Sequence, residues 1–382
     1  MIIQAKKAIG IVSYGAKIPR FKITGETVAA AQGKVEQKIY KSLGVESKTV
    51  PGRDEDTITL STASGFQALE RLQLLHTKQH KVRSEVDSLF IGSESHPYAV
   101  KPTGTVVAQA LGIASDSVNG KVKPLALADL QFACKAGTQA LQTCAFFVNT
   151  QFSHYAMAIG TDTAQAKPGD VLEYTAGAGS AAFILGSQGG NGESAFKNKL
   201  LAKLLATTSV ATDTPDFWRR PYQSYPEHAG RFTADPGYFS HIKMAAQLLL
   251  EETQLQASDF EYCIFHSPNA KFPQQVAKEL GFSQEQVERS LLVTQIGNTY
   301  AASSLLGLVN TLDYAQANKK ILVVSYGSGS GSDAFVFETT EYLVEARKKW
   351  EVAGVTPGAF VSQQLQILVP VTYEEYRANS TH

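Results

Sequence analysis

Short apolar runs alternate along this chain with longer segments rich in small and apolar residues. The clearest apolar runs are residues 89–92, 155–160, 262–265 and 321–326. Runs of this length are typical of strands that are buried on both faces. The segment 134–149 carries apolar residues on nearly every side with few charges, which predicts a helix buried between other layers. Alternating strands and helices indicate an α/β fold, with a mixed sheet and helices on its faces.

The same order of elements occurs twice in the chain. The paired segments are 89–92 with 262–265, 134–149 with the region from Gly297 to Ser303, 155–160 with 321–326, and 177–185 with 329–337. Four paired elements in one order predict two halves of similar fold. A Gly-rich stretch at 186–192 is the natural joint between them, so we place an N-terminal half at 1–190 and a C-terminal half at 191–382.

Each half places chemically active side chains at equivalent positions. Glu94 and His266 follow equivalent strands, whereas Cys134 and Asn298 lie where equivalent helices begin. If the halves pack about a pseudo-twofold axis, all four side chains converge on one site. A helix N-terminus and a neighbouring imidazolium both stabilise a thiolate, so Cys134 is the candidate nucleophile. Glu94 is then the candidate general base.

Composition and charge narrow the class of protein. The 382 residues are 43% apolar and 18% charged, and 35 basic residues balance 35 acidic ones without a long basic run. We therefore expect a globular protein with a small ligand, and no nucleic-acid partner. Three cysteines without metal-type spacing indicate a reducing compartment, with no zinc site and no disulfide. Residues 1–10 lack an apolar leader core and no later run is long enough for a bilayer, so we expect a cytoplasmic protein without a membrane segment.

Several longer motifs are more specific than any single residue. They are VPGRDEDT at 50–57, GSESHPYAVKPTG at 92–104, FACKAGT at 132–138, DTPDFWRR at 213–220, HAGRFT at 228–233 and FHSPNAK at 265–271. Together they closely resemble 3-hydroxy-3-methylglutaryl-CoA synthase of the archaeal type, a family of the thiolase superfamily. The resemblance extends over nearly the whole chain. It implies a thiolase-like fold, in which two pseudo-repeated halves pack as a five-layer αβαβα sandwich.

The resemblance also implies a reaction. Acetyl-CoA and acetoacetyl-CoA would condense with water to give 3-hydroxy-3-methylglutaryl-CoA (HMG-CoA) and CoA, on the mevalonate route to isoprenoids. Cys134 would carry the acetyl group as a thioester, and Glu94 would remove a proton from its methyl group. His266 would protonate or hydrogen-bond the oxygen that becomes the tertiary alcohol. CoA thioesters are substrates here, so no cofactor and no metal are implied.

Further contacts follow from the resemblance alone. It assigns substrate binding to Thr175, Thr233, Asn298 and the backbone of Ser328, and CoA phosphate binding to Arg231 and Lys271. It also implies a homodimer and a complex with an acetoacetyl-CoA thiolase, bridged by a small third protein.

Other functions compete with this interpretation. A β-ketoacyl synthase acting on acyl-CoA or acyl carrier protein uses Cys, His and Asn in the same fold, and Gly297-Asn298-Thr299 suits it, but a decarboxylating enzyme needs no base at Glu94. A biosynthetic thiolase lacks support because no second cysteine occurs at 327–332. A non-catalytic acyl-CoA-binding scaffold would not need Cys134, Glu94 and His266 together. Six further residues are interpreted as structural or surface residues, namely Cys144, Cys263, His96, His154, His228 and His241.

Overall fold

One mixed sheet organises the molecule. The computed structural model describes residues 3–4, 8–76, 81–115, 121–163, 166–188, 199–353 and 359–379. The strands of the sheet are β1 (Ile3–Gln4), β2 (Ile9–Lys17), β5 (Val86–Gly92), β6 (Ala126–Leu130), β7 (Tyr155–Thr163), β8 (Ala178–Ser187), β9 (Ala202–Ala211), β12 (Tyr262–Phe265), β13 (Lys320–Val324) and β14 (Gly331–Thr339). They are ordered β12-β13-β14-β9-β2-β8-β7-β5-β6, and β1 pairs with β9. Each of the four apolar runs predicted as strands contains one, although β13 ends at Val324, two residues before the predicted end.

The two ends of this sheet repeat one pattern of pairing. At one end, β5 pairs parallel with β7, β7 pairs antiparallel with β8, and β8 pairs antiparallel with β2. At the other end, β12 pairs parallel with β13, β13 pairs antiparallel with β14, and β14 pairs antiparallel with β9. The repetition expected from the sequence is therefore present in the strands. The predicted boundary at 190 lies outside the described residues and stays a prediction.

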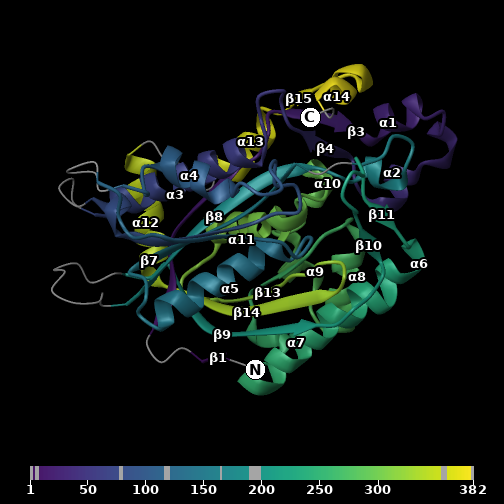
Figure 1. Cartoon of the computed structure of the whole chain (residues 1–382). Helices are drawn as coiled ribbons and strands as arrows, with labels where there is room; N and C mark the ends of the chain where they lie inside the picture. The colour runs from purple at the N-terminus through teal and green to yellow at the C-terminus, as the bar shows by residue number, and fades with distance from the viewer. Residues whose placement is uncertain are drawn as a thin grey trace.

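Helices complete a five-layer arrangement, seen from the side in Figure 1. The central helices α5 (Ala136–Asn149) and α11 (Ser303–Tyr314) lie between the two parts of the sheet and contact strands of both. Outer helices α3 (Thr57–Leu75) and α4 (Thr103–Leu111) cover the first part, whereas α7 (Phe239–Thr253) and α8 (Lys271–Glu279) cover the second. Helix α12 (Glu341–Val352) packs against α3. Most of α5 is buried, as its apolar surface predicted. The αβαβα sandwich is confirmed.

Close backbone packing fixes the centre of the molecule. A methyl group added at Gly137 of α5 would lie 2.2 Å from the Ala301 carbonyl oxygen, and one at Gly160 of β7 would lie 2.5 Å from the same atom. No other residue fits at either position, because real Cβ atoms do not approach backbone this closely. The turn that precedes α11 is thus seated on α5 and β7 without intervening side chains.

A small outlying unit joins the chain termini. The strands β3 (Phe21–Thr24), β4 (Ser47–Val50) and β15 (Val369–Pro370) form a sheet in the order β15-β3-β4.

The hairpin β10 (Phe217–Trp218) and β11 (Glu227–His228) stands apart from both sheets. The other helices are α1 (Gly25–Ala31), α2 (Ile39–Leu43), α6 (Gly230–Phe232), α9 (Gln284–Glu288), α10 (Val293–Ile296), α13 (Ala359–Gln366) and α14 (Tyr373–Asn379). Within the described ranges, every helix is too short or too polar to span a membrane.

Candidate active site

Cys134 lies in a tight turn before α5. The helix begins at Ala136, two residues later than the sequence predicted, because the preceding backbone is not helical. Ala133 adopts a positive φ of 42°, and the Ala136 N–H donates to the Ala133 carbonyl at 3.0 Å. A non-glycine residue is seldom found in this left-handed region, and such positions often carry functional side chains. Cys134 itself is only 9% exposed.

The residue after the cysteine anchors this turn to the other half of the sheet. The Lys135 ammonium lies 3.0 Å from the Asp333 carboxylate of β14, and both side chains are at most 1% exposed. The same carboxylate accepts a hydrogen bond from Thr138 of α5 at 2.9 Å. Burying an ion pair costs solvation free energy, which further hydrogen bonds to the two charged groups help to offset. The pair therefore holds the start of α5 against β14.

Glu94 faces the sulfur, as predicted. It follows β5 by two residues, and the Cys134 thiol donates to Glu94 Oε2 across 3.8 Å. Burial raises the pKa of the Glu94 carboxyl, and the negative charge of Asp162 raises it further. A carboxylate with a raised pKa is a stronger base than an exposed one, which suits removal of a proton from carbon.

Asp162 is the central residue that the sequence did not reveal. It is fully buried near the end of β7. Its Oδ1 accepts hydrogen bonds from the Glu94 N–H at 2.9 Å and from the Ser93 and Ser95 hydroxyls at 2.7 and 2.6 Å. Its Oδ2 accepts from the Ala301 N–H at 2.8 Å. One carboxylate thus fixes the loop that carries Glu94 and ties it to the turn before α11.

Asn298 completes the contacts of the sulfur. A hydrogen bond from its side chain lowers the pKa of Cys134. Asn298 Oδ1 accepts from the Tyr300 N–H at 2.9 Å, which turns the amide nitrogen toward the sulfur. The backbone of Asn298 pairs with the Thr175 segment, since its N–H donates to the Thr175 carbonyl at 2.7 Å. Cys134, Glu94, Asn298 and Thr175 are therefore brought together.

The thiol environment differs from the one expected. Burial raises the pKa of Cys134 well above its ordinary value, and the charges of Glu94 and Asp162 raise it further. Burial also lowers the pKa of His266 to about 3, so its imidazole is neutral at physiological pH. The expectation that a helix end and an imidazolium stabilise a thiolate is wrong here. A helix end contributes roughly 0.3–1 kcal/mol, whereas burial, the largest cause, and the charges of Glu94 and Asp162 all raise the pKa of this thiol.

This electrostatic arrangement predicts how the thiol reacts. Replacing Glu94 by glutamine removes the neighbouring charge that raises the pKa of Cys134, so the thiolate fraction at neutral pH should rise. Alkylation by iodoacetamide, mapped to the Cys134 peptide, should then be faster in Glu94→Gln than in the parent. Cys144 and Cys263 are fully buried and serve as internal controls in the same digest. An unchanged alkylation rate would contradict the proposed coupling.

His266 directly follows β12. Its N–H donates to the Val324 carbonyl of β13 at 2.9 Å, and its carbonyl accepts from the Tyr238 hydroxyl at 2.6 Å. The imidazole is 1% exposed, and its Nδ1 has no hydrogen-bond partner among the described residues. The loop after β13 reaches the nucleophile turn, because a methyl group added at Gly327 would lie 2.4 Å from the Phe132 carbonyl oxygen. An unpaired ring nitrogen is suited to bond a substrate atom.

The other predicted residues lie farther out. Thr233 and Ser328 are half-buried, and Lys271 is exposed as the first residue of α8. In the described ranges, none of these three makes a hydrogen bond or ion pair with Cys134 or Glu94. The Arg231 side chain lies outside the described part of the chain. Their roles in binding remain predictions.

Two segments close over the sulfur. Leu172 and Phe217 pack against the apolar cluster of Cys134, Ala166, Ala176 and Tyr300. Phe217 belongs to the hairpin β10–β11, whose Arg219 lowers the pKa of Glu94 through its positive charge. Trp218 is the last residue of β10 and Arg219 directly follows it, so this hairpin lies beside the site.

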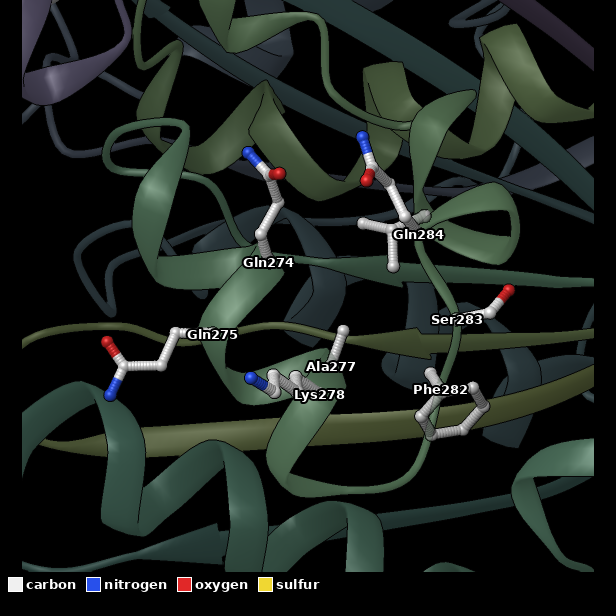
Figure 2. A pocket seen from close by; sticks show the side chains of 8 residues that line it. Gln274, Gln275, Ala277, Lys278, Phe282, Ser283 and Gln284 are labelled. Carbon is white, nitrogen blue, oxygen red and sulfur yellow. The ribbon is translucent and has the colours of Figure 1, made fainter.

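A second, separate pocket of about 420 Å³ opens between α8 and α9. Figure 2 shows the amides of Gln274 and Gln284 extending in the same direction from the two helices, with Lys278 and Phe282 below them. Its lining residues come from 274–287 alone and include none of the residues that contact Cys134. The chemistry described above therefore belongs to the closed site and not to this pocket.

Comparison with known proteins identifies the family. A family model described as 3-oxoacyl-[acyl-carrier-protein (ACP)] synthase III C terminal matches residues 250–339. A solved structure of an HMG-CoA synthase complexed with CoA superposes with a TM-score of 0.81 at 23% identity, covering 98% of this chain and 91% of that one. This likeness supports the thiolase-like fold.

Sequence similarity to archaeal proteins is much higher. The hydroxymethylglutaryl-CoA synthase of Methanopyrus kandleri is 46% identical over 368 residues, covering 96% of this chain and 96% of that protein. The hydroxymethylglutaryl-CoA synthase of Archaeoglobus fulgidus is 48% identical over 335 residues, covering 88% and 90%. Identity of this level over nearly full lengths, with the predicted nucleophile and base in contact, leaves one conclusion. The chain belongs to the hydroxymethylglutaryl-CoA synthase family and is a condensing acyltransferase of the thiolase superfamily.

Proposed function

We propose that Cys134 and Glu94 divide a two-stage condensation between them. In the first stage the Cys134 sulfur attacks the thioester carbonyl of acetyl-CoA, so that acetyl-Cys134 forms and CoA leaves with the thiol proton. The observation that carries this proposal is the 3.8 Å contact between the sulfur and Glu94 Oε2. The Asn298 amide, which hydrogen-bonds the sulfur, supports the same assignment because it favours the anionic form.

The second stage forms the carbon–carbon bond. Glu94 accepts a proton from the acetyl methyl group, and the carbanion attacks the ketone carbon of acetoacetyl-CoA. The resulting alkoxide takes up one proton, which balances the proton that Glu94 accepts and later releases, and the neutral imidazole of His266 donates a hydrogen bond to the same oxygen. Water then hydrolyses the Cys134 thioester and releases HMG-CoA with a free carboxylate. Burial of Glu94, which raises its pKa, supports its role as the base.

The remaining substrate contacts extend this proposal outward. Thr175 and Asn298 line the acetyl site, and Thr233 and the Ser328 backbone contact the second substrate. Arg231 and Lys271 bind the CoA phosphates at the entrance to the active site, since cationic side chains bind phosphate well. The exposure of Lys271 at the start of α8 supports its part of this assignment.

The test follows both stages in one sample. Purified protein incubated with acetyl-CoA alone should lose the Cys134 thiol and gain an acetyl group on that peptide. Addition of acetoacetyl-CoA should then produce HMG-CoA and restore the thiol. If malonyl-acyl carrier protein is decarboxylated and condensed while acetoacetyl-CoA is not consumed, the rival β-ketoacyl synthase function is correct.

We further propose that the chain is a homodimer. The strand β6 ends the sheet, and all five of its residues are only half-buried in one copy. Exposed apolar side chains, Tyr98, Val100 and Val122, lie in the segments that follow β5 and precede β6. An apolar edge strand left unpaired is prone to pair with another chain. Light scattering should give twice the mass of the chain, and a monomer would contradict the proposal.

Two wider assignments also remain proposals. The family resemblance supports a complex with an acetoacetyl-CoA thiolase and a small bridging protein, which co-purification of tagged chains from one cell would test. Three buried cysteines without disulfides support the cytoplasm as the location.

A further inference from the structure

The last helix of the chain lies beside the first strands. In Figure 1, α14 and β15 at the C-terminal end lie next to β3, β4 and α1 from the N-terminal end. The pairing of β15 with β3 fixes this position, with Val369 opposite Phe21. The helix is far from Cys134 in sequence, yet three of its polar side chains, Tyr373, Tyr376 and Arg377, contact segments near the active site.

Glu173 is the main partner of this helix. Its carboxylate is fully buried and accepts a hydrogen bond from the Tyr373 hydroxyl at 2.9 Å. Arg377 lies 3.9 Å from the same oxygen. The Gln32 side chain, directly after α1, and the Gly169 N–H donate to the other oxygen at 2.6 and 2.9 Å. A buried carboxylate needs such partners, so α14 supplies part of what keeps Glu173 in place.

A buried lysine forms the second contact. The Lys48 ammonium of β4 donates to the Tyr376 hydroxyl at 3.0 Å and lies 4.3 Å from the centre of that ring. Burial lowers the pKa of Lys48 to about 7, whereas the nearby charge of Glu173 raises it. Lys48, Glu173 and Tyr376 therefore form one polar cluster under α14.

This cluster adjoins the acetyl site directly. Glu173 precedes Thr175 by two residues, and Thr175 pairs with Asn298 through its backbone. A methyl group added at Gly297 would lie 2.7 Å from Lys48 Cβ and 2.5 Å from the Thr175 carbonyl oxygen. The residue before Asn298 is thus wedged between β4 and the Thr175 segment. A shift of either would move the amide that bonds the sulfur.

The helix also contacts the opposite wall. Arg377 donates to the Tyr225 hydroxyl at 3.1 Å, in the hairpin that carries Phe217. Leu172 from the Glu173 segment and Phe217 from the hairpin both pack against the Cys134 cluster. One side chain of α14 therefore bridges the two segments that close the site.

We propose that α14 is a clasp, formed by Tyr373, Tyr376 and Arg377, which positions both walls of the acetyl site around Cys134. These are positioning residues, because they act through Glu173, Lys48 and Tyr225 and do not touch the substrate. The inference rests on the proposed function, since acetyl transfer to Cys134 is the step that it controls.

The test uses full-length variants that keep the helix. Tyr373→Phe removes only the hydroxyl bonded to Glu173, and Arg377→Gln removes the bridge charge. We expect the double variant to lose about tenfold or more in kcat/KM for acetylation of Cys134, because small misplacements of a reacting group are costly. Glu374→Gln, an exposed carboxylate on the same helix, is the matched control and should leave the rate unchanged.

Two further measurements separate positioning from general stability. Hydrogen exchange of the backbone at 173–177 should accelerate in the double variant but not in the control. In a double-mutant cycle, Tyr373→Phe and Thr175→Ala should show non-additive effects on the acetylation rate, since the clasp acts through that segment. If the parent acetylates and the double variant matches it in rate, or the cycle is additive, the clasp is overturned. A parent that takes up no acetyl group would instead overturn the proposed function.

Discussion

Glu94→Ala should take up acetyl from acetyl-CoA normally yet make almost no HMG-CoA. The thiol does not need this carboxylate, because the Glu94 charge raises the pKa of Cys134 and its removal favours the thiolate. Condensation does need it, since a base must remove the methyl proton. General-base catalysis contributes about 10²- to 10⁴-fold, so turnover should fall by that range.

The measurement is a two-part assay with labelled acetyl-CoA. Label retained on Cys134 reports the first stage, and HMG-CoA formed after acetoacetyl-CoA is added reports the second. Glu252→Ala, which removes an exposed carboxylate near the end of α7, is the control for loss of charge. HMG-CoA formation at the parental rate by Glu94→Ala would show that another group is the base.

Asp162→Asn should impair both stages, although Asp162 is not in the predicted mechanism. An asparagine amide presents N–H groups where the carboxylate accepts from Glu94, Ser95 and Ala301. At least one buried donor then loses its acceptor, which costs about 1–3 kcal/mol of stability. The loop bearing Glu94 should also shift, and a displacement near 1 Å can lower turnover by roughly 10²-fold.

The same variant has a signature in pH dependence. The Asp162 charge raises the pKa of Glu94, so its removal should lower that pKa. The base must be ionised to act, and the acid limb of the condensation rate should therefore move to lower pH in Asp162→Asn. Asp129→Asn is a matched control, because that carboxylate also accepts from backbone N–H groups, at Thr103 and Gly104, but does not hold Glu94. An acid limb that stays in place or moves upward would refute the coupling.

Local patterns were sufficient for the repeated strands and for the contact of Cys134 with Glu94. Buried strands show directly as apolar runs, and duplicated order brings equivalent positions together. Asp162 follows the same logic, since it also lies near the carboxyl end of an apolar strand, but Thr161 and Thr163 beside it made the position resemble an ordinary strand end. That strand-end position is the signal by which it could have been found.

Other features depend on distances that no local pattern contains. The pair of Lys135 with Asp333 joins residues from different halves, and neither residue is unusual in sequence. The direction of the Cys134 pKa shift depends on burial and on two carboxylates, both known only once the chain is folded. The contact of α14 with Glu173 likewise depends on how the two ends of the chain pack together. The sequence predicted none of these three features.

The Asp162 carboxylate joins the backbones of both repeats, so neither repeat forms this centre alone. It accepts hydrogen bonds from the Glu94 N–H of one repeat and from the Ala301 N–H of the other. A single repeat can assemble such a centre only as a symmetric pair of chains, each completing the other. In this chain the two repeats carry different groups, the first the sulfur and the carboxylate, the second the imidazole and the amide.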